Sequence, residues 1–102
     1  MHVRSRFALA SKSKGCNCCE NKIIIIGGRV DGIKSAKVTT FNTKTCEFGE
    51  MPKMLNERES HSAVINHDRL YVIGDHKSIE SIDLNEDEAK WEILKGISLP
   101  QL

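Results

Sequence analysis

Two short stretches of the chain share one pattern of residue types, and this repetition constrains the fold more than any other sequence feature. KIIIIGG at residues 22–28 and RLYVIGD at residues 69–75 each contain a basic residue, four apolar residues, a glycine and a small or turn-prone residue. Such runs, rich in β-branched types, are typical of strands that end in tight turns. The second run begins 47 positions after the first, which indicates an internal repeat.

Three further landmarks recur around these runs in the same order. They are an arginine before a small and apolar run, a strand-like segment that ends in a polar turn, and an aromatic residue before a short apolar run. The pairs are RSRFALA and RESHSAVI, KVTTFNTKT and IESIDLNED, and CEFGEMPKM and KWEILKGISL. We therefore expect strands near residues 5–10, 22–27, 36–42, 46–51, 60–66, 69–74, 78–83 and 90–95. Four short strands in a unit of about 50 residues are typical of one β-propeller blade.

These landmarks also carry a family resemblance. RESHSAVINHDRLYVIGDHKSIESIDLNEDEAKW resembles a kelch repeat nearly throughout, and FNTKTCEFGEMPKMLNER resembles the junction between two such repeats. The chain therefore resembles a pair of kelch repeats, at residues 1–54 and 55–102, of which the first is diverged and has a long first loop. The resemblance implies an all-β fold of two four-stranded antiparallel blades from an incomplete β-propeller.

Departures from the kelch pattern are few. Asp75 replaces the second glycine of the doublet, Phe48 stands where tryptophan is usual, and Ile82 stands where an aromatic residue is usual. The glycine doublet permits positive φ and close packing between sheets, and we expect Trp91 and Phe48 to fill the space between adjacent blades. The resemblance implies that Arg58, with Arg4 as its counterpart, supports polar contacts between strands or blades. The residues that we assign to the repeat scaffold are Gly27, Gly28, Gly74, Arg58, Phe48 and Trp91.

The resemblance implies a protein-interaction module that is related to the substrate receptors of cullin-based ubiquitin ligases. An actin-binding kelch protein fragment and a non-functional propeller fragment are the alternatives, and a kelch-fold enzyme is less favoured. In kelch propellers the loops after the second strand and between blades commonly bind the partner. RVDGIKS and DHKS are the loops after the second strand here. The predicted partner-binding residues are Arg29, Asp31, Lys34, His76 and Lys77.

Other function classes receive little support from the sequence. The net charge of +1 gives no strong field toward nucleic acid or anionic lipid, and the longest apolar run, Ile23 to Ile26, is too short to span a membrane. Cys16, Cys18 and Cys19 are wrongly spaced for a structural zinc site and lack a second pair. We expect no metal, no cofactor and no enzymatic activity. No Asn-x-Ser/Thr acceptor occurs, and we expect a cytoplasmic setting with reduced cysteines.

Two blades do not close a propeller ring, because propellers typically use about four to eight and a repeat does not bury its faces alone. Three interpretations follow. The chain is part of a longer protein that supplies the neighbouring blades, it assembles with copies of itself, or it is a decayed sequence without an independent stable fold.

Overall fold

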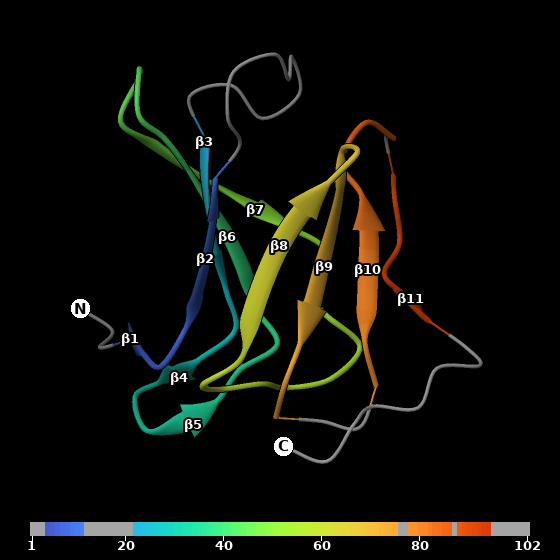
Figure 1. The fold of residues 1–102 in the computed structure, drawn as a ribbon. Helices are drawn as coiled ribbons and strands as arrows, with labels where there is room; N and C mark the ends of the chain where they lie inside the picture. Colours follow the sequence, from blue (N-terminus) through green and yellow to red (C-terminus); the bar gives the residue numbers. More distant parts are fainter. Residues whose placement is uncertain (1–3, 12–21, 76–77, 87, 95–102) are drawn as a thin grey trace.

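The computed structural model describes residues 4–11, 22–75, 78–86 and 88–94. Within them the chain is all-β and contains two four-stranded antiparallel sheets and one three-stranded sheet (Figure 1). The predicted fold class is therefore confirmed, and both large sheets are consistent with kelch blades. No helix long and apolar enough to cross a membrane occurs among these residues.

The first sheet has the strand order β2-β3-β6-β7, and the second has the order β11-β10-β9-β8. The strands of the first sheet are β2 (Ala8–Ser11), β3 (Lys22–Ile26), β6 (Val38–Asn42) and β7 (Glu47–Met51). Those of the second sheet are β8 (Ser62–Asn66), β9 (Arg69–Ile73), β10 (Glu80–Asp83) and β11 (Glu92–Ile93). Each of these strands lies within the range that the repeat predicts, except that β2 ends one residue later, at Ser11.

The two large sheets pack face to face, and β2 of the first lies beside β8 of the second (Figure 1). Alternation along the strands decides which side chains enter this contact: in β3, Ile24 and Ile26 are buried, whereas Ile23 and Ile25 turn toward the other side of the sheet. The small side chains of Ala8 and Ala10 let the second sheet approach closely. The buried apolar core consists of Ala8, Ala10, Ile24, Ile26, Val38, Met54, Leu70, Val72, Ile82 and Trp91.

The three-stranded sheet was not predicted from the sequence. It has the order β1-β4-β5 and consists of β1 (Arg4–Ser5), β4 (Arg29–Val30) and β5 (Ile33–Lys34). The segment interpreted as a loop, RVDGIKS, is a β-hairpin whose two-residue turn is Asp31-Gly32, with φ of 52° and 83°. Asp-Gly is typical of such turns because both residues tolerate positive φ. The hairpin lies at the lower end of the molecule in Figure 1.

The two aromatic residues expected between the blades differ in position. Trp91 is buried between the sheets, and its indole Nε1 donates a hydrogen bond to the Pro52 carbonyl of the connecting segment at 2.7 Å. Phe48 is 72% exposed and lies on the far side of the first sheet. Phe48 therefore does not fill the space between these two sheets, because its strand presents it to the side where the described chain has no neighbouring sheet.

Candidate functional site: the junction between the two sheets

The connecting segment 52–61 is fixed by a buried ion pair. Arg58 and Glu80 are both fully buried, and Nε of Arg58 donates to Oε2 of Glu80 at 3.0 Å. The guanidinium also donates to the carbonyls of Gly74 at 3.0 Å and Ser78 at 2.8 Å. Glu80 in turn accepts the backbone N–H groups of Leu55 and Asn56. Because every polar group of this pair has partners, the pair locks the connection onto the second sheet.

Arg4 has the corresponding position in the first sheet. It donates to the Gly27 carbonyl at 3.0 Å, to Oγ1 of Thr39 at 3.0 Å and to the Lys37 carbonyl at 2.8 Å. Partial burial lowers the pKa of the Arg4 guanidinium. The two predicted arginines thus make parallel contacts, but Thr39 occupies the position that Glu80 occupies in the second sheet. Through these bonds each arginine joins neighbouring segments of its own sheet.

A second set of charges joins the sheets near the β4–β5 hairpin. Glu59 accepts from Nε of Arg29 at 2.5 Å and from Nη2 of Arg29 at 3.2 Å, and it also pairs with Arg6 at 3.4 Å. Asp75 accepts the backbone N–H of Glu59 at 2.9 Å and pairs with Nζ of Lys34 at 3.0 Å. We call these five residues the charged seam. Its bases come from the first repeat and its acids from the second.

The seam shifts the ionisation of its members. The hydrogen bond from Arg29 lowers the pKa of Glu59, and the same contact raises the pKa of Arg29. The pKa of Asp75 is lowered by the hydrogen bond from the Glu59 N–H and then by Lys34. Both carboxylates are therefore held ionised, as charged partners of the opposing repeat.

The predicted partner-binding residues divide into three groups. Arg29 and Lys34 belong to the charged seam, so their charges already have partners within the chain. Asp31 is exposed at the turn of the hairpin. His76 and Lys77 lie outside the described residues. The ion pair of Lys34 with Asp75 shows that the hairpin and the segment after β9 lie at the same end of the molecule.

Sequence reasoning missed several residues at this junction. Ile33 is 71% exposed beside the hairpin turn, where an apolar residue directly after Asp-Gly was an available signal. Glu80 shares a face with Ile82, and an acid among core positions indicates a buried partner. Glu59 is adjacent to the repeat arginine, yet its partners Arg29 and Arg6 are distant in sequence. Only the packing of the sheets brings these charges together.

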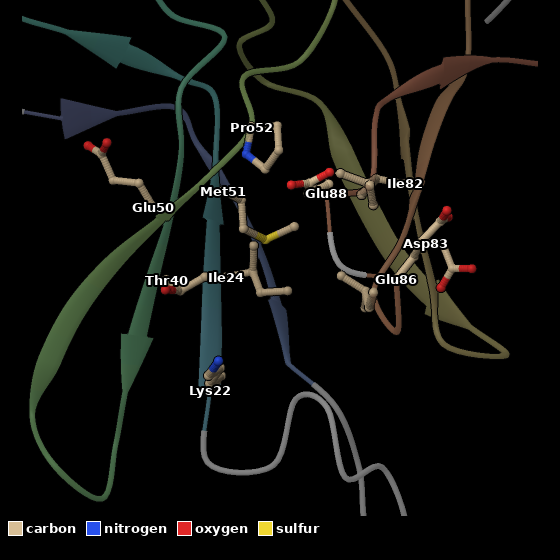
Figure 2. A pocket seen from close by; sticks show the side chains of 12 residues that line it. Lys22, Ile24, Thr40, Glu50, Met51, Pro52, Ile82, Asp83, Glu86 and Glu88 are labelled. Carbon is tan, nitrogen blue, oxygen red and sulfur yellow. The ribbon is translucent and has the colours of Figure 1, made fainter.

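A groove of about 270 Å³ lies between the sheets, toward the end of β3 that is away from the β4–β5 hairpin (Figure 2). Figure 2 shows Ile24 and Met51 meeting at its centre, with Ile82 facing them from the second sheet. The groove is rimmed by Lys22 and by the carboxylates Glu50, Asp83, Glu86 and Glu88. Glu50 is paired with Lys37 at 3.0 Å. The groove suits contact with an apolar side chain, with charge only at its rim.

Metal chemistry finds no support in the described ranges, where no cluster of three or more His, Cys, Asp or Glu side chains is placed to hold an ion. Cys46 is exposed and forms no disulfide within the described part of the chain. Cys16, Cys18 and Cys19 lie outside the described residues.

His61 gives the junction a pH dependence. Its Nε2 donates to the Ile26 carbonyl of the first sheet at 2.8 Å, and its Nδ1 is buried and has no hydrogen-bond partner among the residues that the structure describes. Burial is the main cause that lowers the pKa of His61, and the nearby Arg58 adds to it; Asp75 acts in the opposite direction. The imidazole is therefore neutral in the folded protein near pH 7, with its proton on Nε2.

We expect the free energy of unfolding to fall as the pH drops below about 6.5, the ordinary pKa of histidine. The unfolded chain then binds a proton that the folded chain resists, so stability is complete above this pH and declines toward the lowered folded pKa. Urea unfolding between about pH 7.5 and pH 5.5 measures the decline. His61→Gln retains a donor for the Ile26 carbonyl, and we expect its free energy of unfolding to change less with pH over this range. An equal decline in His61→Gln would contradict the assignment. Glu59 and Asp75 add a further loss only at lower pH, since their pKa values are depressed.

Comparison with known proteins agrees with the fold. No family model matches the chain. A curated relative, Kelch repeat protein M-T9 of Myxoma virus (strain Lausanne), is 33% identical over 57 residues. The matched region is 56% of this chain and 11% of that protein, so the chain spans a small part of the relative's length. The match and the four-stranded antiparallel sheets together support the resemblance to kelch repeats.

Proposed function

We propose that this chain is a kelch-type protein-interaction segment whose partner binds at the end that carries the β4–β5 hairpin. The observation that carries the proposal is the hairpin itself. It presents Ile33, which is 71% exposed, between the exposed Asp31 and Lys34. An exposed apolar residue with charged neighbours is the usual composition of a protein contact with an apolar centre and a polar rim.

The charged seam supports this surface. Lys34 and Arg29, at the base of the hairpin, pair with Asp75 and Glu59 of the second repeat. These pairs restrain the hairpin relative to both sheets, which lowers the entropy that a partner must remove on binding. A restrained hairpin is better suited to specific recognition than a loop without such contacts.

Within this proposal, the preferred lineage is that of the substrate receptors of cullin-based ubiquitin ligases, in a cytoplasmic setting. The support is the kelch pattern of the second repeat and the similarity to a kelch repeat protein. Actin binding is the second candidate. The similarity favours an interaction module over a kelch-fold enzyme, although fold kinship alone does not fix function.

The test is photo-cross-linking in cells with a benzophenone amino acid at position 33. The control carries the same amino acid at position 44, in the exposed β6–β7 turn at the opposite end of the first sheet. We expect a discrete protein adduct from position 33 and not from position 44. Overproduction of these 102 residues should compete with the intact receptor for its substrate and so lengthen the half-life of the adducted protein. In the chain without the photoreactive amino acid, Ile33→Asp should abolish the change in half-life.

Equal adducts from both positions would contradict a hairpin surface. An adduct at position 33 without any change in the partner's half-life would contradict the ligase lineage and leave the interaction surface intact. Co-sedimentation with actin filaments tests the second candidate. The ligase interpretation predicts that the chain stays in the supernatant.

A further inference from the structure

The first sheet has an apolar face turned away from the second sheet. Leu9 is 58% exposed there and Phe48 is 72% exposed. The rings of Phe41 and Phe48 are in tilted contact, with centroids 4.9 Å apart and an interplanar angle of 49°. We call this surface the outer face of the first sheet; it holds a hollow of about 330 Å³ lined by Phe7, Leu9, Ile23, Ile25, Phe41 and Phe48. A contiguous apolar surface of this kind marks an interaction site.

Strand register shows what this face corresponds to within the repeat. In the first sheet Ile23 pairs with Phe41, and Phe41 pairs with Phe48. In the second sheet Leu70 pairs with Ile82. Ser81 pairs with Glu92 in the antiparallel register, so the next residue, Ile82, lies level with Trp91. The equivalent residues of the second sheet, Leu70, Val72, Ile82 and Trp91, are at most 5% exposed.

The second sheet buries these positions by packing on the first sheet. The same positions of the first sheet are equally apolar, and they lack a neighbouring sheet in the described chain. The outer face is therefore suited to packing against another sheet, in the way that the second sheet packs against the first. A loop or a small molecule would leave part of the row of four positions uncovered.

A sheet that packs on the outer face must carry side chains like those that the first sheet turns toward the second sheet. At the intrachain junction this surface includes the pairs Ala8–Ile26 and Ala10–Ile24. The same register positions in the second sheet are Ser62–Ile73 and Val64–Tyr71. These side chains lie on the face away from the first sheet, where Val64 is 57% exposed and Ile73 is 36% exposed. The chain therefore carries both halves of one sheet-to-sheet contact.

One difference between the sheets favours a separate molecule as the neighbour. Glu80 binds the N–H groups of Leu55 and Asn56, which belong to the segment that connects the two sheets covalently. The equivalent position of the first sheet is Thr39, whose hydroxyl is bound by Arg4. If a sheet packs on the outer face, the first sheet therefore has no carboxylate at this position to bind the segment that connects to it. Apolar contact between the two sheet faces would hold such a sheet in place.

We propose that the outer face of the first sheet binds the outer face of the second sheet of another copy of this chain. The contact is head to tail, and a head-to-tail contact that closes produces a ring. Three or four copies would supply six or eight sheets, within the range of about four to eight that propellers use. This assembly goes beyond the proposed function, since it requires no partner at the hairpin.

Light scattering after size-exclusion chromatography tests the proposal with two matched variants. Leu9→Lys places a charge on the outer face of the first sheet, and Val64→Lys does so on that of the second. The two side chains have nearly equal exposure, 58% and 57%. A buried unpaired ammonium is unfavourable, so each variant should lose at least about a hundredfold in association constant. Leu55→Lys, in the segment that connects the two sheets, is the control because Leu55 is also 57% exposed, and it should assemble as the unmodified chain does.

Mixing the variants identifies the contact. Leu9→Lys retains the outer face of its second sheet, and Val64→Lys retains that of its first sheet. An equal mixture should therefore form a one-to-one dimer through the two intact faces, whereas each variant alone stays monomeric. If either variant loses its thermal transition in circular dichroism alone, the mixture should restore the transition.

Three results would overturn the proposal. The first is a monomeric unmodified chain at every concentration at which it is soluble. The second is a dimer that persists in Val64→Lys and is lost in Leu9→Lys, since this indicates that two first sheets meet. The third is a mixture that restores neither the dimer mass nor the thermal transition.

Discussion

Arg58→Met will lower the free energy of unfolding by about 3–5 kcal/mol, because it leaves the carboxylate of Glu80 buried without its cationic partner. Both side chains are completely buried, and Arg58 also donates to the carbonyls of Gly74 and Ser78, which would lose these bonds. Small domains have total stabilities of about 5–15 kcal/mol, so this one substitution removes a large share. Urea unfolding followed by circular dichroism measures the loss.

Arg4→Met is the matched control, since Arg4 makes the parallel contacts in the first sheet without a carboxylate. It is partly exposed, and we expect a loss of about 1–2 kcal/mol. Combining Arg58→Met with Glu80→Gln should recover about 1–3 kcal/mol relative to the sum of the single losses. Equal losses for Arg58→Met and Arg4→Met, or strict additivity in the double variant, would refute the special cost assigned to the buried charge.

Gly28→Ala is expected to destabilise the protein by about 3 kcal/mol or more, from backbone strain and overpacking together. Gly28 has a φ of 91°, and a Cβ atom there would lie 2.4 Å from the Ser5 carbonyl oxygen and 2.8 Å from the backbone of Phe7. These neighbours are backbone atoms of the segment from β1 to β2, so no side-chain rotation relieves the clash. Thermal unfolding followed by circular dichroism gives the difference.

Gly32→Ala separates the two causes. Gly32 has a similar φ of 83°, but a Cβ atom there would meet none of the described residues within 4 Å. Only the left-handed conformation is then unfavourable, at about 1 kcal/mol. If the two alanine variants prove equally stable, close approach of the backbone at Gly28 is not what the glycine provides.

The repeat made the strands of both large sheets predictable. Strand positions follow from local patterns, such as alternation in β3 and the glycine that ends it, and a second copy of each pattern reinforces the first. Asp75 has a φ of 56°, in the left-handed region that the glycine doublet indicated. The Asp31-Gly32 turn was equally local, yet its flanking strands, β4 and β5, are only two residues each and were interpreted as loop.

The polar contacts of the junction were less predictable. The pairing of Arg58 with Glu80 joins residues that are 22 positions apart, and that of Arg29 with Glu59 joins residues 30 positions apart. No residue pattern specifies which of several acids meets a given base, because the packing of the sheets decides it. Phe48 is a different case. Its apolar character was evident from the sequence, but whether its side of the sheet is covered by another sheet depends on how the sheets are arranged.

The charged seam gives the junction a polarity. Arg6, Arg29 and Lys34 stand on one repeat and Glu59 and Asp75 on the other, so two first repeats stacked in the same way would leave these bases without acidic partners. The positions in the first repeat that correspond to Glu59 and Asp75 are Ser5 and Gly28, so a sheet on the outer face of the first repeat meets no equivalent acids there. Added salt screens the partly exposed Lys34–Asp75 pair more than the pairs of the nearly buried Glu59, and it leaves apolar contact intact. Ionic strength therefore distinguishes the two faces of the first sheet: it weakens the attachment on the inner side and spares any attachment on the outer side.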